Sequence, residues 1–264
     1  MARFMEGLLK RVGDIAKRDE PISIHVMLAI QELLEEQWQE QLRGNASPEE
    51  MRRITRTCSW FLNGFCCALR GEEMVLLEFA GTLYYLCRLN QPPFGLEKHF
   101  MNKVSGPTKG NRISGAQFLI PCVGTTSSRL QPGLWVRRYV LLMHRLGQTG
   151  GYLYSRDGAK AKLSDFHEDF YGTLETIQAG RPDLIPKEMD VRESYGILRS
   201  LRRGVTSHAL NRGVERPLVD AVNRWRTERQ AALKGTIPFL GSLCADYARL
   251  DQLTETLLRY SKAL

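Results

Sequence analysis

The sequence lacks the patterns that mark several large classes of protein. It contains only six cysteines and none of them forms a C-x-x-C pair, so neither a zinc knuckle nor a disulfide scaffold is indicated. No apolar run approaches the roughly 20 residues that span a bilayer. Residues 1–18 mix charges with short apolar steps and lack the apolar core of a secretory signal. We therefore expect an intracellular chain with reduced, buried thiols and no membrane partner.

The histidines give no sign of a metal centre. There are five of them, and their positions show no spacing typical of metal ligands: His25, His99, His144, His167 and His208. We therefore expect no metal cofactor. By contrast, a hydrophobic content of 43% and a charged content of 25% are typical of a folded globular protein. A chain of 264 residues is long enough for one large domain or two small ones.

Positive charge is abundant and unevenly distributed. The net charge of +8 and the isoelectric point near 9.3 favour an acidic partner, with nucleic acid first and an anionic membrane second. Between Arg192 and Arg229 there are nine arginines, four acids and no lysine, so this stretch carries a net charge of +5. Guanidinium groups bind phosphate through two parallel hydrogen bonds. Because such runs are also typical of a solvated face, the neighbouring motifs must decide between the two readings.

Hydrophobic periodicity predicts a mainly helical fold with a small antiparallel sheet, that is, an α+β fold. Ser47-Pro48-Glu49-Glu50 is a strong helix start, with a capping residue, a first-turn proline and a glutamate at the capping-box position. The stretch from Met74 to Cys87 reads as a helical turn followed by β-rich residues. Other helices are expected from Ser23 to about Leu42, from Gly133, from Ser164, through the arginine-rich stretch, from near Pro217, and from Leu243 to about Leu258; strands are expected at 99–104, 117–123 and 151–154.

Three motifs occur in a fixed order along the chain. The first is Leu69-Arg70-Gly71-Glu72-Glu73, and the second is Arg199-x-x-Arg202-Arg203-Gly204, which leads into Thr206 and His208. The third is Asn223-Arg224-Trp225-Arg226, which is followed by tyrosines. This order resembles the catalytic domain of the tyrosine recombinases, the site-specific DNA integrases and resolvases. It is most similar to the divergent members carried by eukaryotic mobile elements, and the resemblance covers roughly Thr55 to Leu264.

The resemblance implies strand breakage and rejoining of double-stranded DNA through a covalent 3′-phosphotyrosyl intermediate, without a cofactor. Arg70 and Arg202 match the two arginines that hold the scissile phosphate, whose developing negative charge guanidinium donors stabilise. Glu73 matches the acid that orients the first arginine. Lys109 matches the general acid, Trp225 the hydrogen-bond donor to the phosphate, and Tyr247 the nucleophile. Non-specific contacts to the DNA backbone are expected from Arg203, Arg212, Arg224 and Arg226.

Two positions depart from the family pattern. Arg199 stands where the family usually has histidine or lysine, and a guanidinium does not titrate in a useful range, so it is a poor proton shuttle. The nucleophile is also displaced, because the first tyrosine after Trp225 is Tyr247, 22 residues later, and Tyr260 is the next. We favour Tyr247 and keep Tyr260 as the alternative. These departures leave open a catalytically inactive, domesticated relative that binds DNA or a protein.

The resemblance also divides the chain into parts. We expect residues 1–45 to be a helical lead-in or remnant of a core-binding domain, and residues 46–264 to be the catalytic domain. Only 69 residues precede Arg70, so a full core-binding domain is not expected and autonomous DNA binding should be weak.

Family members act as tetramers on paired sites and exchange a C-terminal segment, for which Asp251 to Leu264 is the candidate. A eukaryotic host would imply a nuclear location. A helical interaction module with solvated arginines is the remaining alternative.

Overall fold

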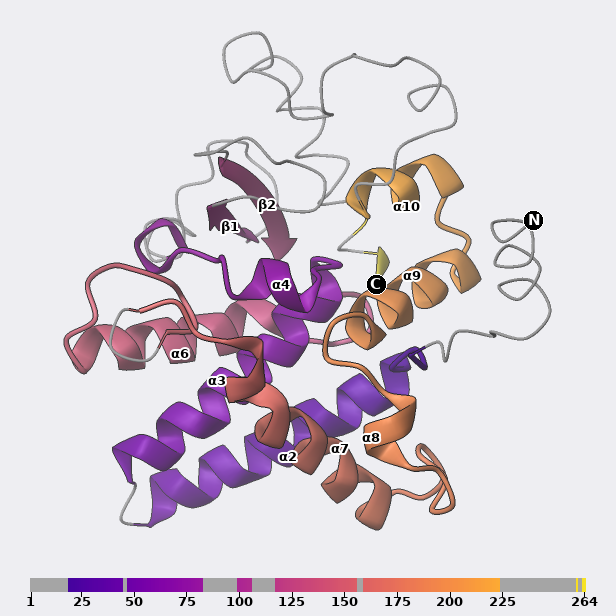
Figure 1. Ribbon diagram of the computed structural model, residues 1–264, viewed down its shortest axis with the longest axis horizontal. Helices are drawn as coiled ribbons and strands as arrows, with labels where there is room; N and C mark the ends of the chain where they lie inside the picture. The colour runs from indigo at the N-terminus through magenta and orange to yellow at the C-terminus, as the bar shows by residue number, and fades with distance from the viewer. Residues whose placement is uncertain are drawn as a thin grey trace, which may run out of the picture.

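The computed structural model describes residues 19–44, 47–82, 99–105, 117–155, 159–223, 260 and 263–264. This part of the chain is mainly helical and contains one two-stranded antiparallel sheet, as expected for an α+β fold (Figure 1). The elements are α2 (Ile24–Arg43), α3 (Pro48–Cys66), α4 (Gly71–Met74), β1 (His99–Ser105), β2 (Gln117–Val123), α6 (Pro132–Arg145), the 3-10 helix η1 (Leu163–Phe166), α7 (His167–Gly180), α8 (Val191–Ser194), α9 (Ser200–Asn211) and α10 (Arg216–Val222).

Helix α3 runs through the middle of the molecule and contacts α2, α6, α7 and α9. Its second half is buried on every side, from Thr57 to Cys66, so it supplies the centre of the core. The expected start at Ser47-Pro48 is confirmed, although the Ser47 side chain makes no capping hydrogen bond. Glu50 binds Arg53 instead, with 2.6 Å between Oε1 and Nη2. The expected capping box is therefore absent, and Glu50 pairs with Arg53 one turn further along the helix.

The start of α2 and the apolar face of α6 follow the sequence prediction closely. The Ser23 hydroxyl accepts a hydrogen bond from the Val26 amide at 3.2 Å, which caps α2 as expected. The helix expected from Gly133 is α6, and its apolar residues at helical spacing are buried: Trp135, Val136, Tyr139, Val140 and Met143. Both helices belong to the same hydrophobic core as α3.

The sheet pairs β1 and β2 in the register Phe100 opposite Cys122 and Asn102 opposite Ile120. The two predicted strands are thus confirmed. Asn102 also joins the sheet to α3, because its side-chain amide donates to Asn63 Oδ1 at 2.6 Å and accepts from Asn63 Nδ2 at 3.0 Å. Both asparagines are fully buried, and their reciprocal hydrogen bonds satisfy each other in the core.

Three further local predictions are wrong. The β-rich stretch expected after the helical turn at Met74 is reduced to isolated bridges at Leu77 and Glu78, and residues 79–82 are helical. Residues 151–154 do not form a strand: Tyr152 makes one isolated bridge, to Glu78, and the chain then turns. Ser164 does not cap a helix, since it lies inside η1, and Phe166 is the N-cap residue of α7. The apolar residues that recur at helical spacing in this region are nevertheless buried: Phe166, Phe170, Leu174 and Ile177. The expected helix from Leu243 to Leu258 lies outside the described residues.

The described cysteines Cys58, Cys66, Cys67 and Cys122 are buried free thiols, as expected. Burial is the main reason why the pKa of Cys58 and that of Cys122 are raised above the ordinary range of a thiol. A thiol that stays protonated is a poor nucleophile. None of the helices in the described ranges has the length and apolar character needed to cross a membrane.

Candidate phosphate-binding site

Arg70 is placed by an abrupt turn at the end of α3. The helix ends at Cys66, and Ala68 then adopts a left-handed backbone conformation with φ of 48°. The amide of Leu69 returns to the carbonyl oxygen of Gly64 at 3.0 Å, which closes the turn. Arg70 follows as the N-cap residue of the short helix α4. Arg70 therefore lies a single turn beyond the end of the buried helix α3.

The Glu73 carboxylate is the centre of the site. Its Oε2 accepts the backbone amide of Arg70 at 2.8 Å, and its Oε1 accepts Nη1 of the Arg70 side chain at 3.1 Å. Glu73 is only 3% exposed. A buried carboxylate is costly unless it is paired, and the Arg70 guanidinium provides one partner. One carboxylate therefore fixes both the backbone and the side chain of Arg70.

Arg202 approaches the same carboxylate from α9. Its Nη1 lies 3.7 Å from Glu73 Oε2, and its side chain is 6% exposed. The two arginines are far apart in the sequence, yet they meet at the two oxygens of one buried side chain. The structure therefore brings together three of the predicted site residues: Arg70, Glu73 and Arg202.

Two glycines permit α9 to lie against its neighbours. The Gly71 amide donates to the carbonyl oxygen of Leu198 at 3.3 Å, just before α9 begins, and a Cβ at Gly71 would lie 3.0 Å from the carbonyl oxygen of Ile197. A Cβ at Gly204, in the middle of α9, would overlap the carbonyl oxygen of Ile22. The glycines of the first two motifs thus have a packing role, since larger residues would push α9 away.

The cluster carries two guanidinium groups and one carboxylate, so it is positive overall. The Arg70 side chain is 26% exposed and is the member that solvent reaches. Contact between Arg202 and a ligand requires the side chains that cover it to move. Guanidinium donors oriented by a buried carboxylate can stabilise negative charge on a phosphate that reaches them.

Three other predicted residues, Arg199, Arg203 and Arg212, lie on α9 or at its ends, within the described part of the chain. Arg199 is exposed at the N-cap of α9, and Arg203 is partly buried in its first turn. Arg212 is exposed at the far end of α9, where its Nη2 lies 3.5 Å from Ser127 Oγ. The predicted residues Lys109, Arg224, Trp225, Arg226 and Tyr247 lie outside the described residues.

A polar pair that the sequence did not reveal joins α9 to α10. The Thr206 hydroxyl donates to the carbonyl oxygen of Arg202 at 2.7 Å, and Nδ2 of Asn223 donates to that hydroxyl at 3.0 Å. Asn223 is fully buried and also donates to the carbonyl oxygen of Val219. In the sequence, this pair is marked only by its closeness to the predicted site residues. Thr206 lies one helical turn after Arg202, and Asn223 directly precedes Arg224.

The last described residues lie beside α9 (Figure 1). Tyr260 is 1% exposed, and burial raises its pKa well above the usual range of a phenol, while the nearby charge of Arg202 acts in the opposite direction. His208 Nε2 lies 3.3 Å from the carbonyl oxygen of Leu264, and Ser128 Oγ also donates to that oxygen. Burial lowers the pKa of His208.

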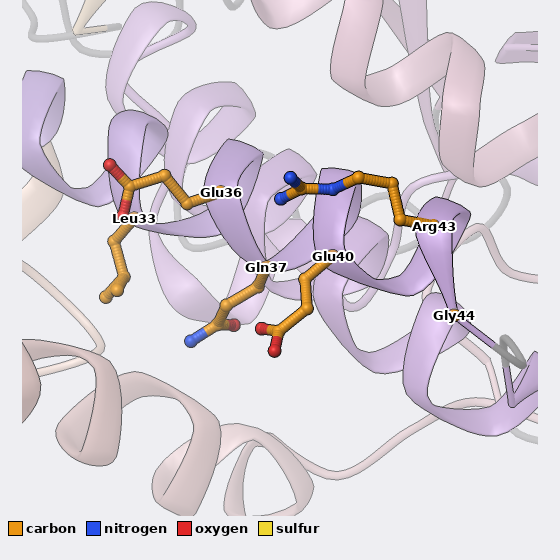
Figure 2. Close-up of a pocket in the computed structure, with 6 residues that line it drawn as sticks. All are labelled: Leu33, Glu36, Gln37, Glu40, Arg43 and Gly44. Atoms are coloured by element: carbon orange, nitrogen blue, oxygen red, sulfur yellow. The ribbon is translucent and has the colours of Figure 1, made fainter.

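A separate groove runs along α2 and contains none of the predicted residues. It is shallow and open, and its lining is Leu33, Glu36, Gln37, Glu40, Arg43 and Gly44. Gln37 and Glu40 project to the same side of the helix (Figure 2). A phosphate there would meet two carboxylates, so this groove does not suit DNA.

Comparison of the chain with protein-family models and with curated proteins finds no match. Across the described residues, no group of three or more histidine, cysteine, aspartate or glutamate side chains could hold a metal ion.

Proposed function

We propose that the protein breaks and rejoins DNA strands as a member of the tyrosine recombinase class. The substrate is double-stranded DNA, and the reaction passes through a 3′-phosphotyrosyl intermediate. The tyrosine oxygen attacks the scissile phosphorus and forms a phosphotyrosyl bond, and the bond to the 5′-oxygen breaks as that oxygen takes up a proton. Rejoining is the reverse transfer, in which a 5′-hydroxyl displaces the tyrosine.

The convergence of Arg70 and Arg202 on the Glu73 carboxylate is the observation that carries this proposal. The two motifs that supply these residues are far apart in the sequence, and an unrelated surface arrangement gives no reason for them to meet. In the proposed reaction the two guanidinium groups hold the non-bridging oxygens of the phosphate, where negative charge develops during attack. Glu73 holds the guanidinium groups in position.

The remaining roles rest on the resemblance alone. Tyr247 is the proposed nucleophile, Lys109 the proposed general acid, and Trp225 the proposed hydrogen-bond donor to the phosphate. Arg203, Arg212, Arg224 and Arg226 are the proposed contacts to the DNA backbone. A tetramer on paired sites is the proposed assembly.

The experiment that tests this proposal is trapping of the covalent intermediate. The substrate is a labelled pool of duplexes with randomised sequence, each nicked so that the short strand released by cleavage diffuses away and cannot rejoin. A protein–DNA adduct that survives denaturing electrophoresis is expected with the native chain and is expected to disappear in Tyr247→Phe. The proposal is contradicted if no adduct forms, or if adduct formation survives both Tyr247→Phe and Tyr260→Phe.

One observation favours a second candidate, a relative that binds DNA without cutting it. Arg199 is exposed at the start of α9 and does not contact Glu73 in the described structure. As a guanidinium it cannot serve as the general base that histidine or lysine provides in the family. This candidate predicts salt-dependent DNA binding with no covalent adduct, so the same experiment separates the two.

A further inference from the structure

Asn102 is a polar residue at a core-facing position of β1. Its side chain lies on the same face of the strand as those of Phe100 and Val104, because alternate residues of a strand share a face, and all three residues are fully buried. Asn63 is fully buried as well, in the half of α3 that is enclosed on every side. Burying two amides costs free energy that apolar side chains would not cost, so specific contacts must compensate for them.

The Asn102 amide binds two points at the end of α3. Its Nδ2 donates to Asn63 Oδ1 at 2.6 Å and to Cys67 Sγ at 3.3 Å. Asn63 Nδ2 donates back to Asn102 Oδ1 at 3.0 Å, and the Cys67 thiol donates to Asn63 Oδ1 at 3.3 Å. The three side chains thus form a closed network, which ties the last turn of α3 and its C-cap residue, Cys67, to β1.

The segment that follows Cys67 carries the candidate site. Ala68 comes next, with its left-handed φ of 48°, and is followed by Arg70 and Glu73. A residue other than glycine is strained in this conformation, which persists only where the surrounding structure holds it. The Asn102 amide holds the residue directly before Ala68. The direction in which the chain leaves α3 therefore depends on this contact.

Strand β1 also holds the chain beyond the candidate site. The Glu78 amide donates to the carbonyl oxygen of Lys103 at 2.8 Å, and the Ser105 amide donates to that of Leu76 at 3.0 Å. The side chains of Lys103 and Glu78 form an ion pair, with 2.8 Å between Nζ and Oε2. The segment between Cys67 and Leu76 is therefore attached to one strand at both of its ends.

On the basis of the proposed function, we infer that Asn102 is a positioning residue for Arg70. It fixes the turn after α3 against β1, and so determines where the Arg70 guanidinium lies relative to that of Arg202. A fully satisfied polar network specifies a single arrangement of the elements that it joins. A displacement of the guanidinium by about 1 Å is enough to slow a reaction by roughly 10²-fold.

The test separates position from stability. The double variant Asn63→Leu with Asn102→Leu replaces both amides by apolar side chains of similar size, which costs little stability because each amide is the main partner of the other. Asn102→Leu alone leaves the Asn63 amide without that partner and should lower the denaturation midpoint. Leu174→Ala is the matched control for lost stability, because it opens a cavity in α7, which packs against α2, α3 and α8.

All variants are compared in the adduct assay described above, at a temperature where each is folded by circular dichroism. The double variant should have a denaturation midpoint close to the native one, yet its saturating rate should fall by roughly 10²-fold. The DNA concentration that gives half of that rate should stay the same, because the lost interaction belongs to the transition state. Leu174→Ala should react at the native rate.

The inference is overturned if the double variant reacts at the native rate, or if Leu174→Ala slows the reaction as much. If the double variant does not fold, Asn102→Ser replaces it in the comparison, since a hydroxyl is too short to reach both Asn63 and Cys67. Asn102→Ser should slow the reaction by roughly 10-fold, and a native rate in this variant would likewise overturn the inference.

A native chain that forms no adduct would contradict the proposed function, and the role of Asn102 is then tested without catalysis. The amides of Leu69 and Arg70, both hydrogen-bonded in the native turn, should exchange with solvent faster in the double variant than in the native chain. The Leu174 amide on α7 should exchange at the same rate in both. Unchanged exchange at Leu69 and Arg70 would overturn the role given to Asn102.

Discussion

Arg70 and Arg202 are held by opposite oxygens of one carboxylate, with Arg70 Nη1 at 3.1 Å from Glu73 Oε1 and Arg202 Nη1 at 3.7 Å from Glu73 Oε2. The carboxylate is buried, whereas the Arg70 side chain is partly open to solvent. The arrangement therefore stabilises the fold and also keeps two guanidinium groups close together. The contribution of Glu73 to stability and the contribution of the guanidinium groups to the reaction can be measured separately.

Glu73→Gln should destabilise the protein, because it removes the only negative charge among the three groups. Removal of the charge on one member of a buried ion pair is strongly destabilising, and the free energy of unfolding should fall by about 3 kcal/mol. Urea denaturation followed by circular dichroism measures this. Glu72→Gln is the matched control, since Glu72 is the exposed neighbour in α4 and should change the free energy of unfolding little. Equal effects of the two variants would contradict the role given to Glu73.

Arg70→Ala should reduce the rate of adduct formation by roughly 10²–10³-fold, the usual effect of removing one donor that stabilises a developing charge. Arg70→Lys should recover only part of the loss, because an ammonium group cannot make the two parallel hydrogen bonds of a guanidinium. Arg181→Ala is the control, since Arg181 is exposed and pairs with Asp183 on the surface. A native rate in Arg70→Ala, or equal losses in Arg70→Ala and Arg181→Ala, would exclude Arg70 from the reaction.

The sequence predicted those elements whose determinants are local. The α6 stripe is buried as expected because its apolar residues recur at the helical period and no other interaction competes with them. The predicted Ser47 capping box does not form, and Glu50 makes an ion pair with Arg53 in the same helix instead. Residues 151–154 have β-forming side chains, but Tyr152 forms only an isolated bridge with Glu78, so the pattern alone was insufficient.

The candidate site depends on contacts that no local pattern encodes. Arg70 and Arg202 were paired only through a resemblance, and their meeting depends on Gly71, which permits α4 to touch the chain just before α9. The Thr206–Asn223 pair and the buried Tyr260 were not predicted, because a polar side chain gives no sign of its partner until the helices are packed. Tyr260 was read as an alternative nucleophile, and the structure places it in the core.

Thr206→Val should lower the free energy of unfolding by about 1–3 kcal/mol, because it leaves the buried Asn223 amide without one of its partners. Thr206→Ser retains the hydroxyl and should be closer to the native value. Thermal denaturation of the two variants gives the comparison. If serine and valine prove equally destabilising, the hydroxyl makes no contribution and only the methyl group matters.

His208 makes stability depend on pH. Burial lowers its pKa, with smaller effects in the same direction from Arg212 and His25, although the hydrogen bond to Leu264 opposes them. The unfolded chain, with an ordinary histidine pKa of 6.5, then binds the proton more tightly than the folded protein does. The stability contributed by neutral His208 is therefore present above pH 6.5, decreases as the pH falls below that value, and levels off below the folded pKa.

The expected measurement is a fall in the denaturation midpoint between about pH 8 and pH 5, which His208→Gln makes shallower. His144→Gln is the control, because His144 is exposed on α6. If the pH dependence of the denaturation midpoint is unchanged in His208→Gln, other titrating groups cause that dependence.

The most direct measurement of the proposed function is the site of covalent attachment on the protein. The native chain is incubated with the nicked duplex pool, digested with nuclease and trypsin, and analysed by mass spectrometry. Trypsin separates the two tyrosines, because Tyr247 falls in the peptide 235–249 and Tyr260 in the peptide 260–262. We predict a nucleotide on Tyr247. A nucleotide on Tyr260 would contradict the proposed choice of Tyr247 as the nucleophile, and the absence of any nucleotide-bearing tyrosine would contradict the proposed function.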